Sequence, residues 1–441
     1  MRVAATGIGA HWMADGVFKL LRAGMRGPTR PKADSVEADD AATMAQSRSR
    51  PAWAEVDLAA VTHNTRLLSR LVRPAQVCAV VKAHGYGHGA PAVAKAALAG
   101  GAIGLAVALV DEGAELRRHG VHGPILLLSE CGADAAATAV SCTLTPTVYT
   151  AEGVEQIARA ARLLGQTTSV HLKVDTGMHR VGAPPADVPA LVRAIMDEPI
   201  LRFEGLWTHL SVADGECAED RSYTLEQLER FDGVVAEVAR QGVHPDIIHA
   251  ANTAGAIAFP TARYGMVRSG IGIYGYLPGP AAAAAFTAAV GGETLLPALS
   301  LKARVVSVRM CDEGERPSYG RMRALPQRSL VATVPIGYAD GVPRALFTNG
   351  FEVLIGGKRR PLAGMVTMDQ IMVDCGGDAS VGPGDEVVLL GRQGDEEITA
   401  DDWAAMLGTI SYEVLCGIGP RVPRMMVNGP ESGGGSSPPM P

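Results

Sequence analysis

A lysine follows a short apolar run near the start of the chain, in the sequence AVVKAHGYGHG at 79–89. Burial disfavours the charged form of a lysine, and a neutral amine is a nucleophile that forms Schiff bases with aldehydes. The three glycines of this segment allow a tight turn close to a ligand, and Tyr86 lies four residues after Lys82. Taken alone, Lys82 could equally be an ordinary solvated or salt-bridged lysine.

The elements that would position this lysine alternate between strand and helix. Helical stretches at 59–72, 90–98 and 225–241 separate apolar runs of the kind found in buried parallel strands. The runs are AWAEVDL, QVCAVV, AIGLAV, PILLLS, TVYT, SVHLKVD, FEGLWTHLS and PDIIHAA. About eight such units predict an α/β fold, a closed (β/α)8 barrel with its chemistry at the carboxyl ends of the strands. The alternative is an open doubly wound sheet, but no GxGxxG follows the first strand.

The pattern changes after Leu299. Short alternating strands, punctuated by glycine and proline, predict a small and mostly antiparallel β domain. The stretch GPAAAAAFTAAVGGE at 279–293 is expected to be a linker or a loop. The predicted organisation is a disordered extension over 1–50, a barrel over 51–290, a β domain over 291–428 and a flexible tail over 429–441.

Composition excludes several classes of protein. The 441 residues carry a formal net charge of −6, without the basic excess expected of a nucleic-acid-binding protein. No apolar run approaches the roughly 18 residues of a membrane helix. The seven cysteines are odd in number and never spaced as CxxC. They indicate reduced thiols in a cytoplasm rather than a disulfide framework or a zinc site, and we expect no bound metal.

Eight segments, in order, resemble the motifs of the alanine racemase family. They are AVVKAHGYGHG (79–89), HLKVDTGMHRVG (171–182), HAANTAG (249–255), MVRSGIGIYG (266–275), PSYG (317–320), PIGYADG (335–341), MVTMDQIMVD (365–374) and ISYEVLCGIGPRVPR (410–424). One departure is His84-Gly85, where the family usually has Asn-Ala. The resemblance implies an isomerase dependent on pyridoxal 5′-phosphate (PLP), which interconverts L- and D-alanine and supplies D-alanine for peptidoglycan.

Inverting a stereocentre requires one group to remove a proton from one face and another to return it to the opposite face. The resemblance assigns these roles to Lys82, which would also hold PLP covalently, and to Tyr319 of PSYG. Read alone, Tyr319 would more often be a core tyrosine with a satisfied hydroxyl. In the family this tyrosine reaches the partner subunit's site, which implies a head-to-tail homodimer. Because a tyrosine titrates near pH ~10, cations or donors must surround it.

The resemblance also assigns the residues that bind the cofactor. Arg268 would donate to the pyridine nitrogen, because an arginine has only donors. His209 would form a hydrogen bond with Arg268 in turn. The nitrogen then stays unprotonated, which weakens the electron sink and favours return of the proton at the same carbon. The remaining cofactor residues are Tyr86, Asn252, which shapes its loop, and the phosphate ligands Thr253, Gly270, Ile271 and Tyr412.

For the substrate, the resemblance implies that Arg180 binds the carboxylate together with the backbone N–H of Met368 from the partner subunit. Lys173 matches a lysine that is often carbamylated to brace this arginine, although a plain strand-end lysine is the alternative. Tyr338 and Tyr276 would narrow the entrance to fit a small side chain. Because an apolar pocket rejects an added hydroxyl by about a hundredfold at most, a broader racemase acting on serine stays open.

Two further functions would fit the same barrel. A PLP-dependent amino-acid decarboxylase would need a catalytic cysteine, and none of the cysteines lies in such a motif. A non-enzymatic PLP carrier would consist of the barrel alone. The predicted β domain and Tyr319 argue against that carrier.

Overall fold

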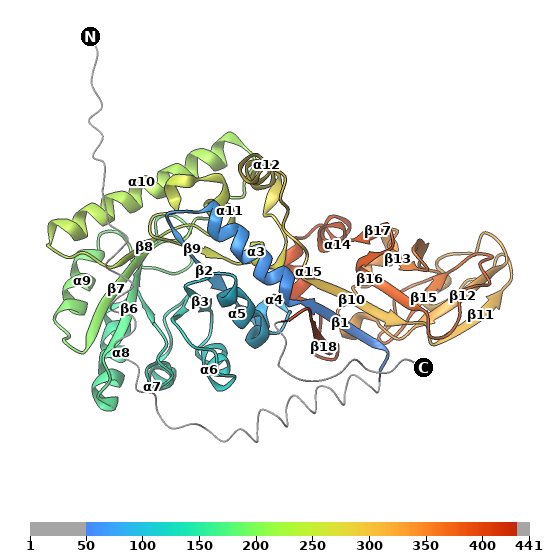
Figure 1. The fold of residues 1–441 in the computed structure, drawn as a ribbon, viewed down its shortest axis with the longest axis horizontal. Helices are drawn as coiled ribbons and strands as arrows, with labels where there is room; N and C mark the ends of the chain where they lie inside the picture. The colour runs from blue at the N-terminus through green and yellow to red at the C-terminus, as the bar shows by residue number, and fades with distance from the viewer. Residues whose placement is uncertain (1–49, 430–441) are drawn as a thin grey trace, which may run out of the picture.

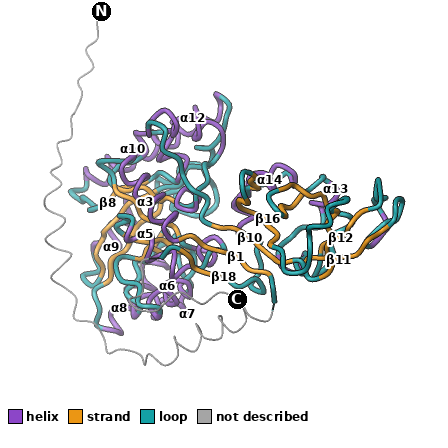
Figure 2. Tube along the Cα trace, turned by 45° about the vertical axis from the view of Figure 1, so that its right-hand side comes forward, coloured by secondary structure: helices purple, strands orange, loops and turns teal. Residues whose placement is uncertain are grey.

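The structure, a computed structural model, describes residues 50–429. The predicted extension and tail therefore fall outside the described residues, apart from Arg50 and Gly429. Two lobes lie side by side: a barrel surrounded by helices, and a lobe built mainly of strands (Figure 1). The two lobes are also separate in the view turned by 45°, in which β1 and β10 run between them (Figure 2).

The first lobe is a closed parallel barrel. Its strands pair in the orders β4-β3-β2-β9 and β5-β6-β7-β8. Backbone bonds from Thr145 N to Ile125 O (2.8 Å) and from Gly265 N to Ile248 O (3.1 Å) join the two sheets into one wall. The strands are β2 (Gln76–Val80), β3 (Gly104–Val107), β4 (Ile125–Leu127), β5 (Thr147–Val148), β6 (Thr168–Lys173), β7 (Leu201–Trp207), β8 (Ile247–His249) and β9 (Met266–Ser269). The predicted fold class is confirmed.

Helices cover the outside of the barrel and are amphipathic where they pack. In α8 (Ala151–Leu164) the buried residues recur at helical spacing, the Thr150 side chain accepts from Gly153 N at 2.9 Å, and Gly165 ends the helix. The other helices of this lobe are α3 (Leu58–Leu71), α4 (Lys82–Tyr86), α5 (Ala90–Ala99), α6 (Val110–Arg118), α7 (Ala133–Ser141), α9 (Val188–Met196), α10 (Ala218–Arg240), α11 (Thr253–Ala258), α12 (Gly279–Val290), η1 (Pro260–Ala262) and η2 (Ile271–Tyr274).

The second lobe contains two sheets, with strand orders β14-β13-β16-β10-β1-β18 and β11-β12-β15, and β17 pairs with β16. All pairs are antiparallel except β1 with β18. The strands are β1 (Ala52–Asp57), β10 (Leu299–Arg304), β11 (Ser307–Cys311), β12 (Ser329–Val334), β13 (Glu352–Ile355), β14 (Lys358–Pro361), β15 (Ile371–Asp374), β16 (Glu386–Gln393), β17 (Glu396–Ile398) and β18 (Arg424–Val427). Its helical turns are η3 (Tyr319–Arg321), η4 (Tyr338–Asp340), α13 (Ala345–Thr348), α14 (Ala400–Leu407) and α15 (Ser411–Cys416).

Two sequence predictions are wrong in detail. The run AWAEVDL, expected among the barrel strands, forms β1 and pairs with β10 and β18 of the second lobe. The eighth barrel strand is instead the four-residue β9. The alanine-rich stretch expected to be a linker or loop forms α12, because alanine has the highest helix propensity. Across residues 50–429, no helix is both long and apolar enough to cross a membrane.

Candidate active site

A pocket of about 580 Å³ opens at the carboxyl ends of the barrel strands, against α15 of the second lobe. Most of the predicted site residues line this one pocket: Lys82, Tyr86, Lys173, Arg180, His209, Asn252, Thr253, Arg268, Gly270, Ile271 and Tyr412. A separate cavity of about 520 Å³ lies beside α12 and is lined by Tyr276. The prediction that Tyr276 narrows the entrance is therefore wrong, because its buried side chain lines that other cavity.

Lys82 begins a left-handed turn directly after β2. The φ angles of Ala83, His84, Gly85, Tyr86 and Gly87 are all positive, between 51° and 80°. A left-handed conformation costs about 1–2 kcal/mol for each residue other than glycine. Such strain persists only where the surroundings hold it, and it concentrates at functional sites. The departure at His84-Gly85 places a glycine, which adopts this conformation without cost, in the middle of the turn.

Several contacts hold the turn in place. The Glu112 carboxylate accepts from the backbone N–H of Ala83 at 2.6 Å and also from two N–H groups after β3. Arg424 donates from Nε to the carbonyl of Gly87 at 2.8 Å. A Cβ on Gly87 would lie 2.4 Å from the Leu415 carbonyl oxygen. Only a glycine therefore allows the turn to pack this closely against α15.

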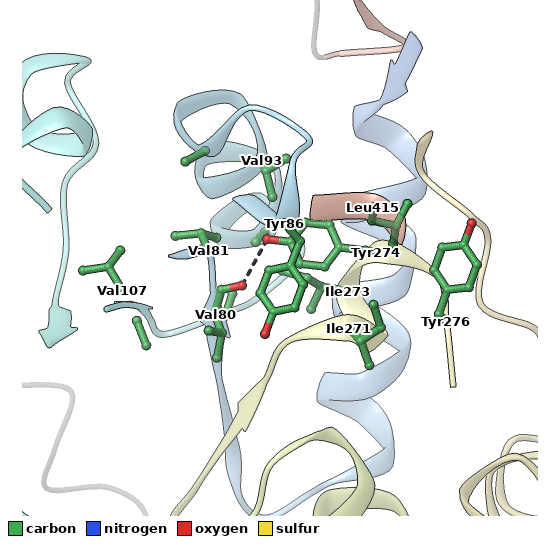
Figure 3. Close-up of a cluster of buried hydrophobic side chains, with 14 of the residues drawn as sticks. Val80, Val81, Tyr86, Val93, Val107, Ile271, Ile273, Tyr274, Tyr276 and Leu415 are labelled. Atoms are coloured by element: carbon green, nitrogen blue, oxygen red, sulfur yellow. Dashed lines mark hydrogen bonds between the residues drawn. The ribbon is translucent and has the colours of Figure 1, made fainter. Parts of the chain in front are cut away.

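Aromatic rings close one side of the pocket. Tyr86 stacks on Tyr274 with ring centroids 4.8 Å apart, and Tyr412 lies 6.0 Å from Tyr86. The Tyr274 hydroxyl donates to the Val80 carbonyl at 3.0 Å, which ties these rings to the end of β2 (Figure 3). The Tyr86 hydroxyl packs on Gly270, where a Cβ would approach it to 2.5 Å. Tyr86 and Tyr412 thus line the pocket together with Lys82 and Gly270.

The two lysines of the pocket have lowered pKa values. Burial, followed by the charge of Arg180, lowers the pKa of Lys82 below its ordinary value. Lys173 is 3% exposed, and its Nζ lies 4.4 Å from the centre of the Trp207 ring. Burial, followed by the charges of Arg268 and Arg180, lowers the pKa of Lys173 to about 7. A substantial fraction of this amine is therefore neutral near neutral pH.

Arg268 is buried in the wall of the pocket. Its Nη2 donates to the carbonyls of Thr208 (2.9 Å) and Ala250 (2.8 Å), and it lies 3.2 Å from Nδ1 of His209. Burial lowers the pKa of Arg268 to about 9, which leaves it charged at neutral pH. Burial, followed by the charge of Arg268, lowers the pKa of His209 well below its ordinary value. A neutral His209 accepts from Arg268, as the predicted contact requires.

Thr253 and Gly270 meet in the lining of the pocket. The Thr253 hydroxyl accepts from Gly270 N at 3.0 Å and lies 3.3 Å from the Ser269 hydroxyl. The Asn252 side chain accepts from Gly255 N at 2.9 Å and caps the start of α11. Hydroxyls and backbone N–H groups of this kind suit a phosphate.

Arg180 lies on the loop that follows β6. The Asp175 carboxylate accepts from the backbone N–H groups of Gly177 (3.0 Å) and His179 (3.1 Å), and the Tyr223 hydroxyl donates to the Gly177 carbonyl at 2.8 Å. These bonds fix the loop, so the exposed Arg180 side chain lies at the mouth of the pocket.

Besides Tyr276, three predicted residues are not in this pocket. Tyr319, Tyr338 and Met368, here called the β-domain face, are 72%, 42% and 52% exposed on the second lobe. Their backbones are fixed to one another. Ala339 N donates to the Met368 carbonyl at 3.0 Å, and the Ser318 hydroxyl donates to the Met365 carbonyl at 2.6 Å. A single chain therefore holds the two predicted bases, Lys82 and Tyr319, on different surfaces.

A buried carboxylate supports the β-domain face from below. Asp340 is fully buried and accepts two hydrogen bonds from Arg50, at 2.5 and 2.6 Å. It also accepts from the backbone N–H of Gly337 at 2.9 Å, and Arg421 lies 3.4 Å away. Arg421 in turn donates to Asp369 at 2.7 Å. The backbone next to Tyr338 and Met368 is thus held by ion pairs.

Sequence reasoning missed two residues that shape the site. Trp207 lies 4.4 Å from both the Lys173 amine and the Arg268 guanidinium, so its ring packs against two basic side chains of the site. It stands two residues before His209, and strand alternation would have aimed both side chains at the same face. Glu112, on α6, holds the turn that follows Lys82. No pattern in the sequence linked Glu112 to that turn, because the two lie far apart along the chain.

Comparison with known proteins agrees with this arrangement. Sequence models of the alanine racemase N-terminal and C-terminal domains match residues 56–278 and 298–426. The alanine racemase of Symbiobacterium thermophilum is 47% identical over 375 residues, which cover 85% of this chain and 97% of that protein.

Solved structures extend the likeness to the fold. The alanine racemase of Streptomyces lavendulae, a D-cycloserine producer, is 36% identical with a TM-score of 0.78, over 86% of this chain and 97% of that one. A histidine racemase of Leuconostoc mesenteroides is 29% identical with a TM-score of 0.75, over 86% and 98%. With both domains matched in order over most of its length, the chain belongs to the alanine racemase family and is an amino-acid racemase.

Proposed function

We propose that the chain interconverts L- and D-alanine with PLP bound at Lys82. The observation that carries the proposal is the convergence of Lys82, Arg268 and the Thr253–Gly270 contact on one pocket. The residues fit the cofactor. A reactive amine, a buried donor and hydroxyl and amide groups line one pocket, and the lack of a side chain at Gly270 lets the Tyr86 ring pack against its backbone. The curated alanine racemases that align over most of the chain support alanine as the substrate.

In this proposal Lys82 holds PLP covalently, and the phosphate lies against Thr253, Gly270, Ile271 and Tyr412. When bound, PLP supplies the electron sink that lets an amino acid lose its Cα proton. Arg268 would donate to the pyridine nitrogen, which it can do only while that nitrogen carries no proton of its own. Arg268 thereby limits the sink and favours return of the proton to the same carbon.

The second base is Tyr319 of a second copy of the chain. Docking the β-domain face over the pocket mouth would bring the Tyr319 hydroxyl to the face of the substrate opposite Lys82. Arg180 and the backbone N–H of the partner's Met368 would bind the carboxylate, and the partner's Tyr338 would narrow the entrance. Nearby cations such as Arg180 would stabilise the phenolate that this tyrosine must form to act as a base.

Lys173 would brace Arg180 as a carbamate. Its neutral amine attacks CO₂, the new N–C bond forms, and one proton leaves to solvent. The product is an anion, so a repulsive pair of cations becomes an attractive one. A ¹³C NMR signal that appears with labelled bicarbonate in the parent protein and is missing in Lys173→Met would support this role.

A broader substrate range is the second candidate. The histidine racemase found among the structural neighbours favours this possibility, because the same fold there serves a larger side chain. Within the described residues, Tyr338 and Met368 lie on the surface that would close the entrance. The selectivity of the site would therefore depend on the assembled dimer.

The test is to incubate the purified protein with PLP and L-alanine in D₂O. Circular dichroism follows loss of optical activity, and NMR follows deuterium at Cα. Two bases on opposite faces predict that D-alanine gains deuterium while remaining L-alanine gains it more slowly. Release of CO₂ without racemisation would establish a decarboxylase instead, and equal labelling of both isomers from the start would contradict two bases. L-serine and L-histidine, run in parallel, measure breadth.

A further inference from the structure

A chain of hydrogen bonds leads away from Arg268 to a carboxylate at the edge of the barrel. Arg268 Nη1 lies 2.7 Å from Nδ1 of His249, and His249 Nε2 lies 2.9 Å from Nδ1 of His171. His171 Nε2 lies 3.3 Å from Oε2 of Glu204. We call His249, His171 and Glu204 the relay. Its members come from β8, β6 and β7, three neighbouring strands of the barrel.

Arg268 at one end of this hydrogen-bond chain and Glu204 at the other fix the position of every ring proton in the relay. An arginine has only donors, and a carboxylate has only acceptors. Because Arg268 donates to Nδ1 of His249, the ring proton of His249 lies on Nε2. That proton is donated to Nδ1 of His171, so the proton of His171 lies on its own Nε2 and is donated to Glu204. All four groups are satisfied with both rings neutral.

The strands are adapted to bring Glu204 to His171. The pairing of β6 with β7 passes from Val170 opposite Phe203 to His171 opposite Gly205, so Glu204 is the additional residue of a β-bulge. A bulge re-aims the side chain that it carries. A Cβ on Gly205 would lie 2.4 Å from the His171 ring, so a glycine is required beside it. Both features weaken a strand, and the relay explains why they are present.

Trp207 holds His249, the member of the relay next to Arg268, in one orientation. Its ring is nearly parallel to the His249 ring, with an interplanar angle of 8° and centroids 5.4 Å apart. The Arg268 guanidinium lies 4.4 Å from the same indole. Rotation of His249 or Arg268 would lose this packing. Arg268 and Glu204 therefore fix the directions of donation, and Trp207 fixes the orientations of Arg268 and His249.

We propose that Glu204 is a positioning residue for racemisation, which acts through His171 and His249 to hold Arg268 as a donor into the pocket. The proposal rests on the proposed function. Without the carboxylate, the His171 proton can move to Nδ1 and be donated to His249. The His249 proton would then face Arg268, two donors would oppose each other, and Arg268 would turn from its place in the pocket.

The test compares Glu204→Met, which removes the acceptor, with Glu204→Gln, which keeps an acceptor oxygen without the charge. The matched control is Glu198→Met. Glu204 pairs with Arg202 at 3.6 Å, and Glu198 likewise pairs with Arg162 at 2.5 Å. The Glu198 side chain is 23% exposed, against 18% for Glu204. Two quantities are measured in the full-length PLP-loaded protein: the ring tautomers by NMR with ¹⁵N-histidine, and the number of racemisation turnovers per transamination event.

In the parent protein, His171 and His249 should both be neutral with the proton on Nε2. Glu204→Met should disturb the His171 tautomer and lower the turnover ratio about tenfold, as removal of carboxylates that orient functional histidines does elsewhere. Glu204→Gln should restore most of the ratio, and Glu198→Met should change neither quantity.

A His171 proton on Nδ1 in the parent protein would overturn the proposal, even if no Glu204 variant folded. So would a Glu204→Met protein that keeps both tautomers and the parent ratio. If the parent protein racemises no amino acid, the proposed function fails, while the tautomers still decide whether the relay is as described.

Discussion

The barrel pocket and the β-domain face differ in what one chain provides. In the pocket, side chains meet one another: Arg268 is bonded to carbonyls and histidines, and Lys173 packs on Trp207. On the β-domain face the backbone is held as firmly, by Asp340 and its arginines, but the side chains extend into solvent. A rigid backbone under exposed aromatic and methionine side chains suits a surface that a partner covers. The comparison teaches that the barrel pocket is formed within one chain, whereas the β-domain face is left uncovered, as the proposed dimer requires.

The largest loss of activity is expected from a substitution in the barrel pocket, at Lys82. Lys82→Ala removes both the covalent anchor and one base, so alanine racemisation should fall by at least about 10⁴-fold. Borohydride reduction should also no longer attach PLP to the chain, as measured by mass spectrometry. Lys95→Ala, at an exposed position on α5, is the control and should keep full activity. A Lys82→Ala protein with near-parent activity would remove this pocket from the mechanism.

Tyr319→Phe tests the other surface. Loss of one base should lower racemisation by about 10²–10⁴-fold while PLP binding is retained. Co-expression with Lys82→Ala then separates one chain from two, because a mixed dimer contains one site with both substitutions and one intact site. Random pairing should restore about a quarter of the parent activity. If the mixture stays inactive although mixed dimers are isolated, each site is made by a single chain.

Gly87→Ala should loosen the contact that completes the pocket. Its φ of +80° and the approach of the Leu415 carbonyl predict a loss of about 3 kcal/mol in the free energy of unfolding. Gly165→Ala is the matched control, since Gly165 has a φ of +60° with open space around it, and should lose only about 1 kcal/mol. Urea denaturation measures both. Equal losses would mean that the α15 contact contributes nothing.

Lys173 gives a pH-dependent effect. Its folded pKa, about 7, lies below the ordinary value of 10.5, so folding releases a proton between these two values and stability from this group rises with pH across that window. The cost of burying the charge is fully present below pH ~7. Lys173→Met should therefore raise the thermal midpoint more at pH 6 than at pH 9, in bicarbonate-free buffer. Lys95→Met is the control, and a gain that is equal at both pH values would contradict the shift.

The smallest effect is expected at Tyr276. Because it lines the separate cavity, Tyr276→Phe should leave the racemisation rate of L-alanine within about twofold of the parent.

Tyr338→Phe, on the β-domain face, should change the ratio of kcat/KM for alanine and serine. A larger change in that ratio from Tyr276→Phe would reverse the assignment made from the structure.

The sequence predicted the lobes better than their borders. Alternation of apolar runs and helices is a local signal, and it was enough for the barrel. It could not say which sheet a strand joins, so AWAEVDL was placed in the barrel although it forms β1. The true eighth strand, Met266–Ser269, is too short for periodicity to identify and lies within a motif read for its chemistry.

Residues of the site were predictable where the chain carries a motif that resembles the alanine racemase family. Lys82, Arg268 and Thr253 stand at strand ends or helix starts, and the structure brings them together. Glu112 and Glu204 were not predicted, because each acts through the backbone or through another side chain across elements distant in sequence. The bulge that re-aims Glu204 depends on a pairing register, which no single strand encodes.

The position of β1 has a consequence for biosynthesis. It is the first described strand to leave the ribosome, yet it lies between β10 and β18, which are made much later. β18 pairs with β1 alone, and β10 would present an open edge without it. A fragment starting at residue 298 would thus carry an orphan strand and an uncovered edge, and should aggregate unless the peptide 50–57 is added back. The pairings of β1 therefore cannot form until residues 299–304 and 424–427 have been translated.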